Sequence, residues 1–215
     1  MNTVNESTEL QRRLRSLRAP RPVMDREREA QLTGRQHEVL ERLSDLFDDG
    51  FAHLTMADIA AHLGCSLRTL YDLAPSRDEM VLTVIDRNLR SIGRSAISML
   101  EKDQAPLDAI RAYLTAANEA VATTTPAFAR DRAATPSANR LVTAHSDYLV
   151  AVTRTLLDLA TEQGDIAEVD TAAVARVVAG LGALFALPEH LEEIDSTPKE
   201  AADAMVDVIL RGLAQ

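Results

Sequence analysis

Histidine and acidic side chains are the usual carriers of catalysis and metal binding, and in this chain the histidines are scattered. No two of them lie close together on one helix face, and the chain has no HExxH pair, no nucleophile elbow and no glycine-rich phosphate loop. The sequence therefore predicts neither an enzyme nor a bound cofactor or metal. One metal site stays open as an alternative, a helical one that combines His145 with carboxylates. The five histidines are His37, His53, His62, His145 and His190.

Residues 55–79, TMADIAAHLGCSLRTLYDLAPSRDE, carry a pattern of another kind. Thr55, Ser66 and Ser76 suit helix N-caps at spacings of eleven and ten residues, intervals too short for ordinary packed helices. Between the first two, Gly64 can adopt the left-handed conformation that turns the chain sharply. This pattern predicts a helix-turn-helix whose second helix, residues 66–73, is presented to a DNA major groove.

The segment before this pattern completes a three-helix unit. Thr33 and Gln36 can form a capping box, apolar residues recur at helical spacing over 35–49, and Gly50 ends the helix. We expect the apolar stripe to pack on the helix-turn-helix, with polar or small residues on the outer side of the last helix. A small helical subdomain without a nucleic-acid role is the alternative. The stripe comprises Val39, Leu40, Leu43, Leu46 and Phe47, and its partners are Ile59, Ala60, Leu63 and Leu70.

The stretch FDDGFAHLTMADIAAHLGCSLRTLYDLAPSRDEM resembles the N-terminal domain of the tetracycline-repressor (TetR) family of bacterial transcription regulators. The resemblance implies an all-α fold in which a helix-turn-helix domain precedes a larger helical ligand-binding and dimerisation domain. Winged and LuxR-like DNA-binding domains begin similarly, but a winged domain needs a β-hairpin where residues 77–101 show a long helical pattern. The matching residues are Phe47, Gly50, Phe51, Thr55, Ile59, Ala60, Gly64, Ser66, Thr69, Leu70, Tyr71, Ser76 and Arg77.

The resemblance also assigns roles within this domain. It implies that Arg68 makes a bidentate contact with a guanine. Two positions depart from the family pattern, because Ala74 stands where an aromatic side chain is frequent and Asp72 where a basic or aromatic one is common. Cys65, the single cysteine, is interpreted as core filling. The implied groove-facing residues are Ser66, Leu67, Arg68 and Thr69, and the implied phosphate contacts are Thr55, Tyr71 and Arg77.

The negative net charge of the chain is unfavourable for binding DNA, but the distribution of the charges matters more than their sum. The formal net charge is −10, and residues 35–80 hold four arginines against nine acids. Most of these acids lie on the first helix or in first turns of helices, where they complement the helix dipole. The N-terminal segment is basic, and Pro20 and Pro22 prevent a continuing helix there. We expect residues 1–32 to form a flexible arm along phosphates or the minor groove, with a functionless tail as the alternative. Its arginines include Arg12, Arg13, Arg15, Arg18 and Arg21.

Helical patterns continue to the end of the chain. Its 215 residues, 46% of them hydrophobic, are ample for a sizeable core. The chain has no 18-residue apolar run and no signal-peptide pattern, which predicts a cytoplasmic protein without membrane contact. The predicted domains are the arm, a helix-turn-helix domain over 33–76 and a ligand-binding and dimerisation domain over 77–215. In this last domain the expected helices span 77–101, 106–123, 126–133, 136–163, 170–186 and 198–213.

The last two of these helices are more apolar than burial of one face requires. Residues 170–186 are almost all small or apolar, and residues 198–213 carry a broad apolar stripe. We expect them to pair with those of a second copy, in a four-helix homodimer interface that holds two DNA-binding heads about one helical turn apart. Burial within a monomer is the alternative.

The few large or polarisable side chains among the alanines of the middle helices are candidates for a small-molecule site. Aromatic bodies with polar tips suit a mostly apolar effector, although packing within the core would explain each of them as well. The candidates are Met99, Tyr113, Phe128, His145, Tyr148 and Phe185.

Together these features predict a homodimeric DNA-binding regulator, a repressor that a small, mostly apolar effector releases from a palindromic operator. Two alternatives stay open. One is a helical homodimer that uses its N-terminal domain for protein contacts, which the acidic balance favours. The other is a regulator without a small-molecule effector.

Overall fold

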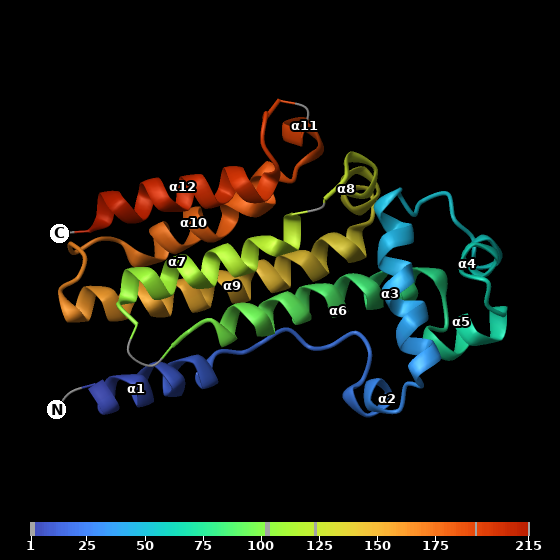
Figure 1. Cartoon of the computed structure of the whole chain (residues 1–215), viewed down its shortest axis with the longest axis horizontal. Coiled ribbons are helices and arrows are strands. Elements are labelled where there is room, and N and C mark those ends of the chain that lie inside the picture. Colours follow the sequence, from blue (N-terminus) through green and yellow to red (C-terminus); the bar gives the residue numbers. More distant parts are fainter. Residues whose placement is uncertain (1–2, 102–103, 123, 192, 215) are drawn as a thin grey trace. The chain divides into compact units, whose positions relative to one another are not determined.

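The computed structural model describes residues 3–101, 104–122, 124–191 and 193–214, with side chains from residue 9 onward. Throughout these residues the regular elements are helices and no strand occurs (Figure 1), so the predicted all-α fold is confirmed. None of the described helices is long and apolar enough to cross a membrane. The chain forms two compact units. Unit 1 comprises residues 1–20, 90–123 and 144–215, and unit 2 comprises residues 21–89 and 124–143.

Unit 2 contains the predicted helix-turn-helix. Capping boxes stand at the starts of α3 and α4, because Thr33 exchanges hydrogen bonds with Gln36, and Thr55 with Asp58. Such local bonds satisfy backbone amides that have no partner within the helix. The helices of unit 2 are α2 (Arg26–Ala30), α3 (Gly34–Asp48), α4 (Met56–Leu63), α5 (Leu67–Leu73), the first part of α6 (Arg77–Ser98), α8 (Pro126–Ala133) and the start of α9 (Pro136–Gln163).

The turn between α4 and α5 depends on Gly64, which has a φ of +60°. Its amide donates to the Ala61 carbonyl at 3.3 Å, and the Cys65 amide donates to the Ala60 carbonyl at 3.0 Å. This pair of bonds is the Schellman arrangement, which requires a left-handed residue after the last helical turn. The predicted role of Gly64 is therefore confirmed.

Replacing Gly64 by alanine should lower the free energy of unfolding of unit 2 by about 1 kcal/mol, because an L-residue is strained at this φ. Nothing lies within 4 Å of the added Cβ, so the loss comes from the backbone alone. Gly93→Ala is the control for an open glycine with helical backbone, since Gly93 is equally open but lies inside α6, in the part that belongs to unit 1, where alanine should stabilise. Urea unfolding followed by circular dichroism measures both. Equal stability of Gly64→Ala and the parent would contradict the need for a positive φ.

The core of unit 2 buries the predicted apolar stripe against α4 and α5. Phe47 and Phe51 are each 1% exposed, with ring centroids 5.7 Å apart. Phe128 of α8 packs edge-on against Phe51 at 5.8 Å, so α8 contributes to the same core. Cys65 packs against this core, in agreement with its interpretation as core filling. The other buried residues include Val39, Leu40, Leu43, Ile59, Ala60, Leu63, Leu70 and Leu73.

Unit 1 is a helical bundle in which α10 and α12 run side by side (Figure 1). The predicted spans lie close to the observed ones, with two differences. Helix α6 ends at Ser98, and the predicted helix over 106–123 is divided into α7 and a 3-10 helix, η1. Unit 1 contains α1 (Thr3–Ser16), the end of α6, α7 (Pro106–Ala117), η1 (Asn118–Val121), most of α9, α10 (Thr171–Phe185), α11 (Pro188–Leu191) and α12 (Pro198–Leu213).

A close approach between η1 and α10 fixes part of this packing. A Cβ at Gly182 would lie 2.9 Å from the Asn118 Oδ1 atom, so a larger residue would force the amide to move. Asn118 is buried, and its Nδ2 donates to Asp203 of α12 at 2.8 Å. Lys199 donates to the same carboxylate at 2.6 Å. One buried amide therefore links three elements of the unit.

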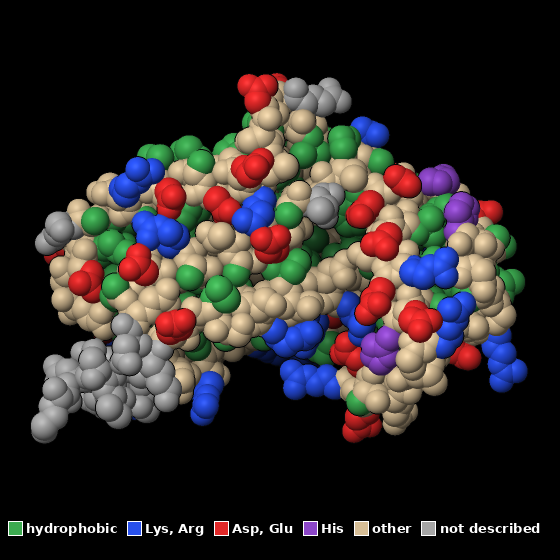
Figure 2. Space-filling view, viewed as in Figure 1, with side chains coloured by type: hydrophobic (Ala, Val, Ile, Leu, Met, Phe, Trp, Pro, Cys, Tyr) green, Lys and Arg blue, Asp and Glu red, His purple; other side chains and the backbone are tan. Residues whose placement is uncertain are grey.

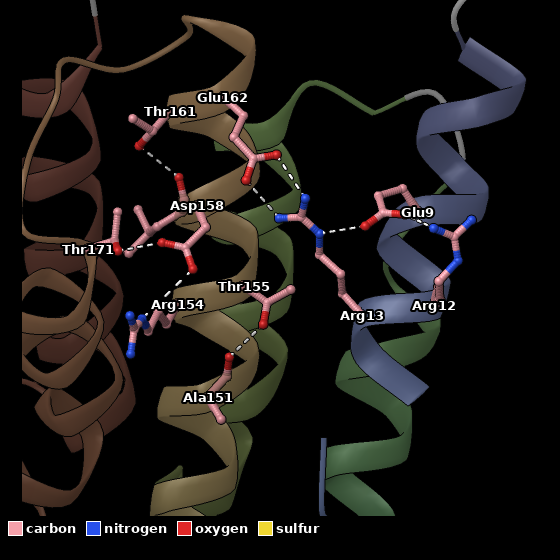
Figure 3. Close-up of polar contacts among 11 residues, drawn as sticks. Glu9, Arg12, Arg13, Ala151, Arg154, Thr155, Asp158, Thr161, Glu162 and Thr171 are labelled. Atoms are coloured by element: carbon pink, nitrogen blue, oxygen red, sulfur yellow. Dashed lines mark hydrogen bonds and ion pairs between the residues drawn. The ribbon is translucent and has the colours of Figure 1, made fainter. Parts of the chain in front are cut away.

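Residues 3–16 form helix α1 where sequence analysis predicted part of a flexible arm (Figure 3). Arg13 donates two hydrogen bonds to Glu162 of α9, both 2.9 Å, and one to Glu9 at 2.8 Å. The apolar face of α1 packs against the core of unit 1 through Leu10 and Leu14, and Leu17 directly after the helix packs there too. The spacing of these leucines is a helical signal that the interpretation as a basic arm did not use. Pro20 and Pro22 follow the helix and do not interrupt it.

The compact units also divide the chain differently from the predicted domains 1–32, 33–76 and 77–215. The boundaries between the units fall inside α6 and α9, and residues 124–143 join unit 2 from far along the sequence. Periodicity in a sequence identifies helices, but it does not reveal the long-range contacts that assign them to one unit or another.

Candidate nucleic-acid interface

The outer face of α5 presents the side chains that sequence analysis assigned to a groove. Tyr71 is 51% exposed and Leu67 44% exposed, and Ser66 and Arg68 are exposed with them. Thr69 is half-buried, and its hydroxyl lies 2.9 Å from that of Ser66. Unit 2 therefore carries a short exposed helix with a guanidinium, a phenol and a hydroxyl, all groups that donate to phosphates or base edges.

The inner face of α5 anchors the helix. Leu70 and Leu73 are 0% and 1% exposed, and Ala74 directly after the helix is 2% exposed. Residues three and four apart share a helix face, so burial of this side leaves Arg68 and Tyr71 outside. Ala74 packs in the core, where its small side chain replaces the aromatic one that the family pattern implies.

Thr55 is exposed at the start of α4, but its hydroxyl is engaged within the cap. The hydroxyl donates to Asp58 Oδ2 at 2.6 Å and accepts from the Asp58 amide at 3.2 Å. Hydrogen bonds from the Thr55 hydroxyl, and then from its amide, hold the pKa of the Asp58 carboxyl below its ordinary value. To donate to a phosphate, as predicted, the hydroxyl would have to leave this carboxylate.

Arg77 has partners that the prediction of a phosphate contact did not foresee. Its Nε donates to the Leu54 carbonyl at 2.6 Å, its Nη2 donates to the Phe51 carbonyl, and its Nη1 pairs with Asp78 at 3.0 Å. Three guanidinium nitrogens are thus engaged inside unit 2. The structure places Arg77 as a brace for the turn between α3 and α4, and the phosphate contact stays a prediction that would use its remaining N–H groups.

Arg28 of α2 is a cation that sequence analysis missed. It is exposed, and its Nη2 donates to the Asp72 carbonyl at 2.9 Å, which places positive charge at the end of α5. A cation at a helix C-terminus complements the helix dipole. The side chain of Asp72 is itself exposed. Sequence analysis had no sign of this contact, because it treated the segment of α2 as part of a flexible arm.

Of the arginines of the expected arm, Arg21 belongs to unit 2 with α5, whereas Arg12, Arg13, Arg15 and Arg18 belong to unit 1. Arg12 pairs with Glu9, and Arg13 bonds both Glu9 and Glu162 within unit 1. Arg15 and Arg18 are exposed. Two of the five arginines named for the arm, Arg12 and Arg13, are therefore engaged in ion pairs of unit 1.

The six candidate effector residues are divided between the two units. Tyr113 is 2% exposed, and Tyr148 and Phe185 pack against the same core of unit 1. Burial, with Tyr148 as a further cause, raises the pKa of the Tyr113 phenol, which is therefore neutral at pH 7. Phe128, by contrast, packs in unit 2, and Met99 is half exposed at the end of α6. His145 is half-buried in unit 1.

The chain is similar to known proteins in structure and not in sequence families. No protein-family model matches it, and no curated protein matches it by sequence. Many solved structures match most of it, among them the following three. A TetR regulator from Haloarcula marismortui has a TM-score of 0.69 and 16% identity over 86% of this chain and all of its own. The TetR-family regulator PfmR from Thermus thermophilus has a TM-score of 0.60 and 25% identity over 82% of this chain and 99% of its own. A TetR-like regulator from Rhodococcus sp. RHA1 has a TM-score of 0.62 and 24% identity over 83% of this chain and 94% of its own.

The chain has the TetR-regulator fold. This confirms the fold that the motif around Gly64 implied, a helix-turn-helix followed by a helical C-terminal part. All three matching proteins are described as transcriptional regulators and none as an enzyme. They are covered over 94% or more of their length, whereas 86% or less of this chain is matched, so it contains segments that they lack.

Proposed function

We propose that this chain is a DNA-binding transcription regulator, a cytoplasmic homodimer in which α5 is the recognition helix of the major groove. The observation that carries the proposal is the exposed outer face of α5, with Arg68 and Tyr71, on a helix whose other face is anchored in the core. Likeness to regulators of the TetR fold supports it.

Each exposed group of α5 suits one part of a DNA site. The guanidinium of Arg68 suits a bidentate contact with guanine O6 and N7, which reads sequence. The hydroxyls of Tyr71 and Ser66 suit phosphates, which position the protein without reading sequence. Arg28, bonded to the end of α5, adds a cation for the backbone next to the groove.

The acidic balance of the helix-turn-helix is less adverse than its sum implies. Asp58 is held in the cap of α4, Asp78 pairs with Arg77, and Glu38 pairs with Arg35 at 3.1 Å. These carboxylates already have partners within unit 2. On α5 itself the acid is Asp72, and the cations Arg68 and Arg28 accompany it.

The surface of α10 and α12 supports the proposed homodimer. Val177 and Leu184 on α10 are 55% and 46% exposed, and Met205 and Val208 on α12 are 40% and 56% exposed. Figure 2 shows hydrophobic side chains along the edge of the molecule over α12. Large apolar side chains gathered on two neighbouring helices are typical of a protein interface. A second copy seated there would form a four-helix contact and give the two-fold symmetric dimer that matches a palindromic operator.

Repression that a small effector relieves completes the proposal. In unit 1, the neutral phenol of the buried Tyr113 beside Tyr148 offers an orienting group in apolar surroundings. An effector releases DNA only if it binds more tightly to the conformation that binds DNA poorly.

Arg68→Ala should weaken binding to DNA by about 1–3 kcal/mol, or about 5- to 150-fold, because the guanine contact is lost. It should also relax the base preference at one position of the site. The probe is the duplex that the parent protein selects most strongly from a randomised library, and fluorescence anisotropy gives the dissociation constant at two salt concentrations. Arg154→Ala, an exposed arginine of α9, is the control and should stay within twofold of the parent.

Two outcomes would overturn the assignment. If Arg68→Ala keeps the affinity and base preference of the parent, α5 does not read DNA. If the parent selects no duplex at low salt, the second candidate is favoured, a helical homodimer whose N-terminal domain contacts another protein. The formal balance of four arginines against nine acids over residues 35–80 is the observation that supports that candidate.

A further inference from the structure

The turn between α3 and α4 is held from two sides by charged side chains of distant segments. The Phe51 and Ala52 amides both donate to Asp131 Oδ2 of α8, at 2.5 and 2.6 Å. From another element, Arg77 donates to the Leu54 carbonyl at 2.6 Å and to the Phe51 carbonyl. The backbone amides of the turn thus donate to a carboxylate, and its backbone carbonyls accept from a guanidinium. Hydrogen bonds to ionised groups are stronger and more directional than neutral ones.

The contact with α8 extends beyond these two amides. The Thr125 hydroxyl at the start of α8 donates to the Asp48 carbonyl at the end of α3. Gly50, which follows, has a φ of +92°, and a Cβ there would lie 3.0 Å from Asp131 Oδ2 and 3.4 Å from the Ala127 Cβ. The absence of a side chain at this residue is what lets the carboxylate reach the backbone of the turn.

We propose that Asp131 is a positioning residue for DNA recognition, because through this turn it sets where α4 and α5 begin. Thr55, which caps α4, follows Leu54 directly, and the turn at Gly64 passes the orientation of α4 to α5. The proposal rests on the proposed function and adds to it a residue outside the contiguous helix-turn-helix. Residues 124–143 are joined to unit 1 at both ends. A ligand that shifts this segment would therefore change DNA affinity without touching α5.

A positioning role and a merely structural one differ in which DNA they affect. A loss of folded protein lowers binding to every duplex in the same proportion. A misplaced recognition helix lowers binding to the selected duplex, while contacts with phosphates still support binding to unrelated DNA. The ratio of the two affinities therefore separates the roles.

The test compares Asp131→Ala and Asp131→Asn with the parent, on the selected duplex and on a scrambled duplex, at a temperature where circular dichroism shows each protein folded. Asp131→Ala should bind the selected duplex at least tenfold more weakly and the scrambled duplex within twofold of the parent. Asp131→Asn keeps a side-chain carbonyl that can accept from the amides, so its affinity for the selected duplex should lie between those of the parent and Asp131→Ala. Loss of an acid alone would strengthen DNA binding, so the expected sign is opposite to that of simple electrostatics. Asp147→Asn, from an exposed ion pair with Arg176, is the control and should change neither affinity.

Hydrogen exchange tests the turn independently of DNA. The Phe51 and Ala52 amides should lose protection in Asp131→Ala and lose less of it in Asp131→Asn, while the Leu43 amide in the core of α3 keeps it. Unchanged protection, or a folded Asp131→Ala protein with the specificity of the parent, would overturn the proposal. If the alanine variant does not fold, the isosteric asparagine variant decides. If the parent selects no DNA, the proposed function fails. The exchange result still tests whether Asp131 holds the Phe51 and Ala52 amides.

Discussion

Val208→Asp should convert the protein from a dimer into a monomer and remove most of its DNA affinity. Val208 of α12 is 56% exposed, and Val177 of α10 is 55% exposed. In the proposed dimer both would leave water against a second copy, where a carboxylate without a partner carries a desolvation penalty of several kcal/mol. A monomer holds one half of a palindromic site, so we expect the affinity to fall at least about a hundredfold, a loss of about 3 kcal/mol.

Sedimentation equilibrium and anisotropy on the selected duplex measure this effect. The mass should fall from about twice 23.4 kDa to 23.4 kDa. Gln163→Asp, which places the same carboxylate at an exposed position of α9, should remain a dimer with the affinity of the parent. A dimeric Val208→Asp protein with full DNA affinity would show that this surface does not join two copies.

Phe51→Ala should destabilise unit 2 by about 3–5 kcal/mol, the usual result of truncating a buried aromatic residue. Phe51 is 1% exposed, and its ring touches those of Phe47 and Phe128, so the cavity opens between three parts of the unit. This loss is a large share of the stability of an ordinary domain, which is about 5–15 kcal/mol.

Urea unfolding at 222 nm should show the midpoint of unit 2 falling by about 2 M, given a typical slope of about 2 kcal/mol per molar urea. Leu67→Ala is the control within the same unit. Leu67 is 44% exposed, and its truncation should change stability by less than about 0.5 kcal/mol. A loss below about 1 kcal/mol for Phe51→Ala would mean that this ring is not a central part of the core.

Features that depend on neighbouring residues could be predicted from the sequence. The capping box of Thr55 and Asp58 and the left-handed Gly64 involve contacts over a few residues, so their pattern is complete in the sequence. The outward face of α5 follows in the same way, because helical periodicity places Leu70 and Leu73 inside and Arg68 outside. For this reason the fold and the exposed face of the candidate site could be predicted from the sequence.

Features that depend on distant partners could not be predicted. The resemblance implied a phosphate contact for Arg77, and no local residue indicates that its guanidinium reaches the carbonyls of Phe51 and Leu54. Phe128 was grouped with the effector candidates by its position among the middle helices, yet it packs on Phe51. The packing of helix α1 in unit 1 could not be predicted, because its ion pair with Glu162 joins segments almost 150 residues apart.

The discontinuity of unit 2 limits how the protein can be re-engineered. A graft that transplants residues 21–89 alone onto another regulator would leave Phe51 without its neighbour from α8 and the Phe51 and Ala52 amides without an acceptor. Chimaeras spliced at a single junction are therefore expected to read DNA poorly. A transferable recognition module needs residues 124–143 as well, with crossovers placed inside both α6 and α9.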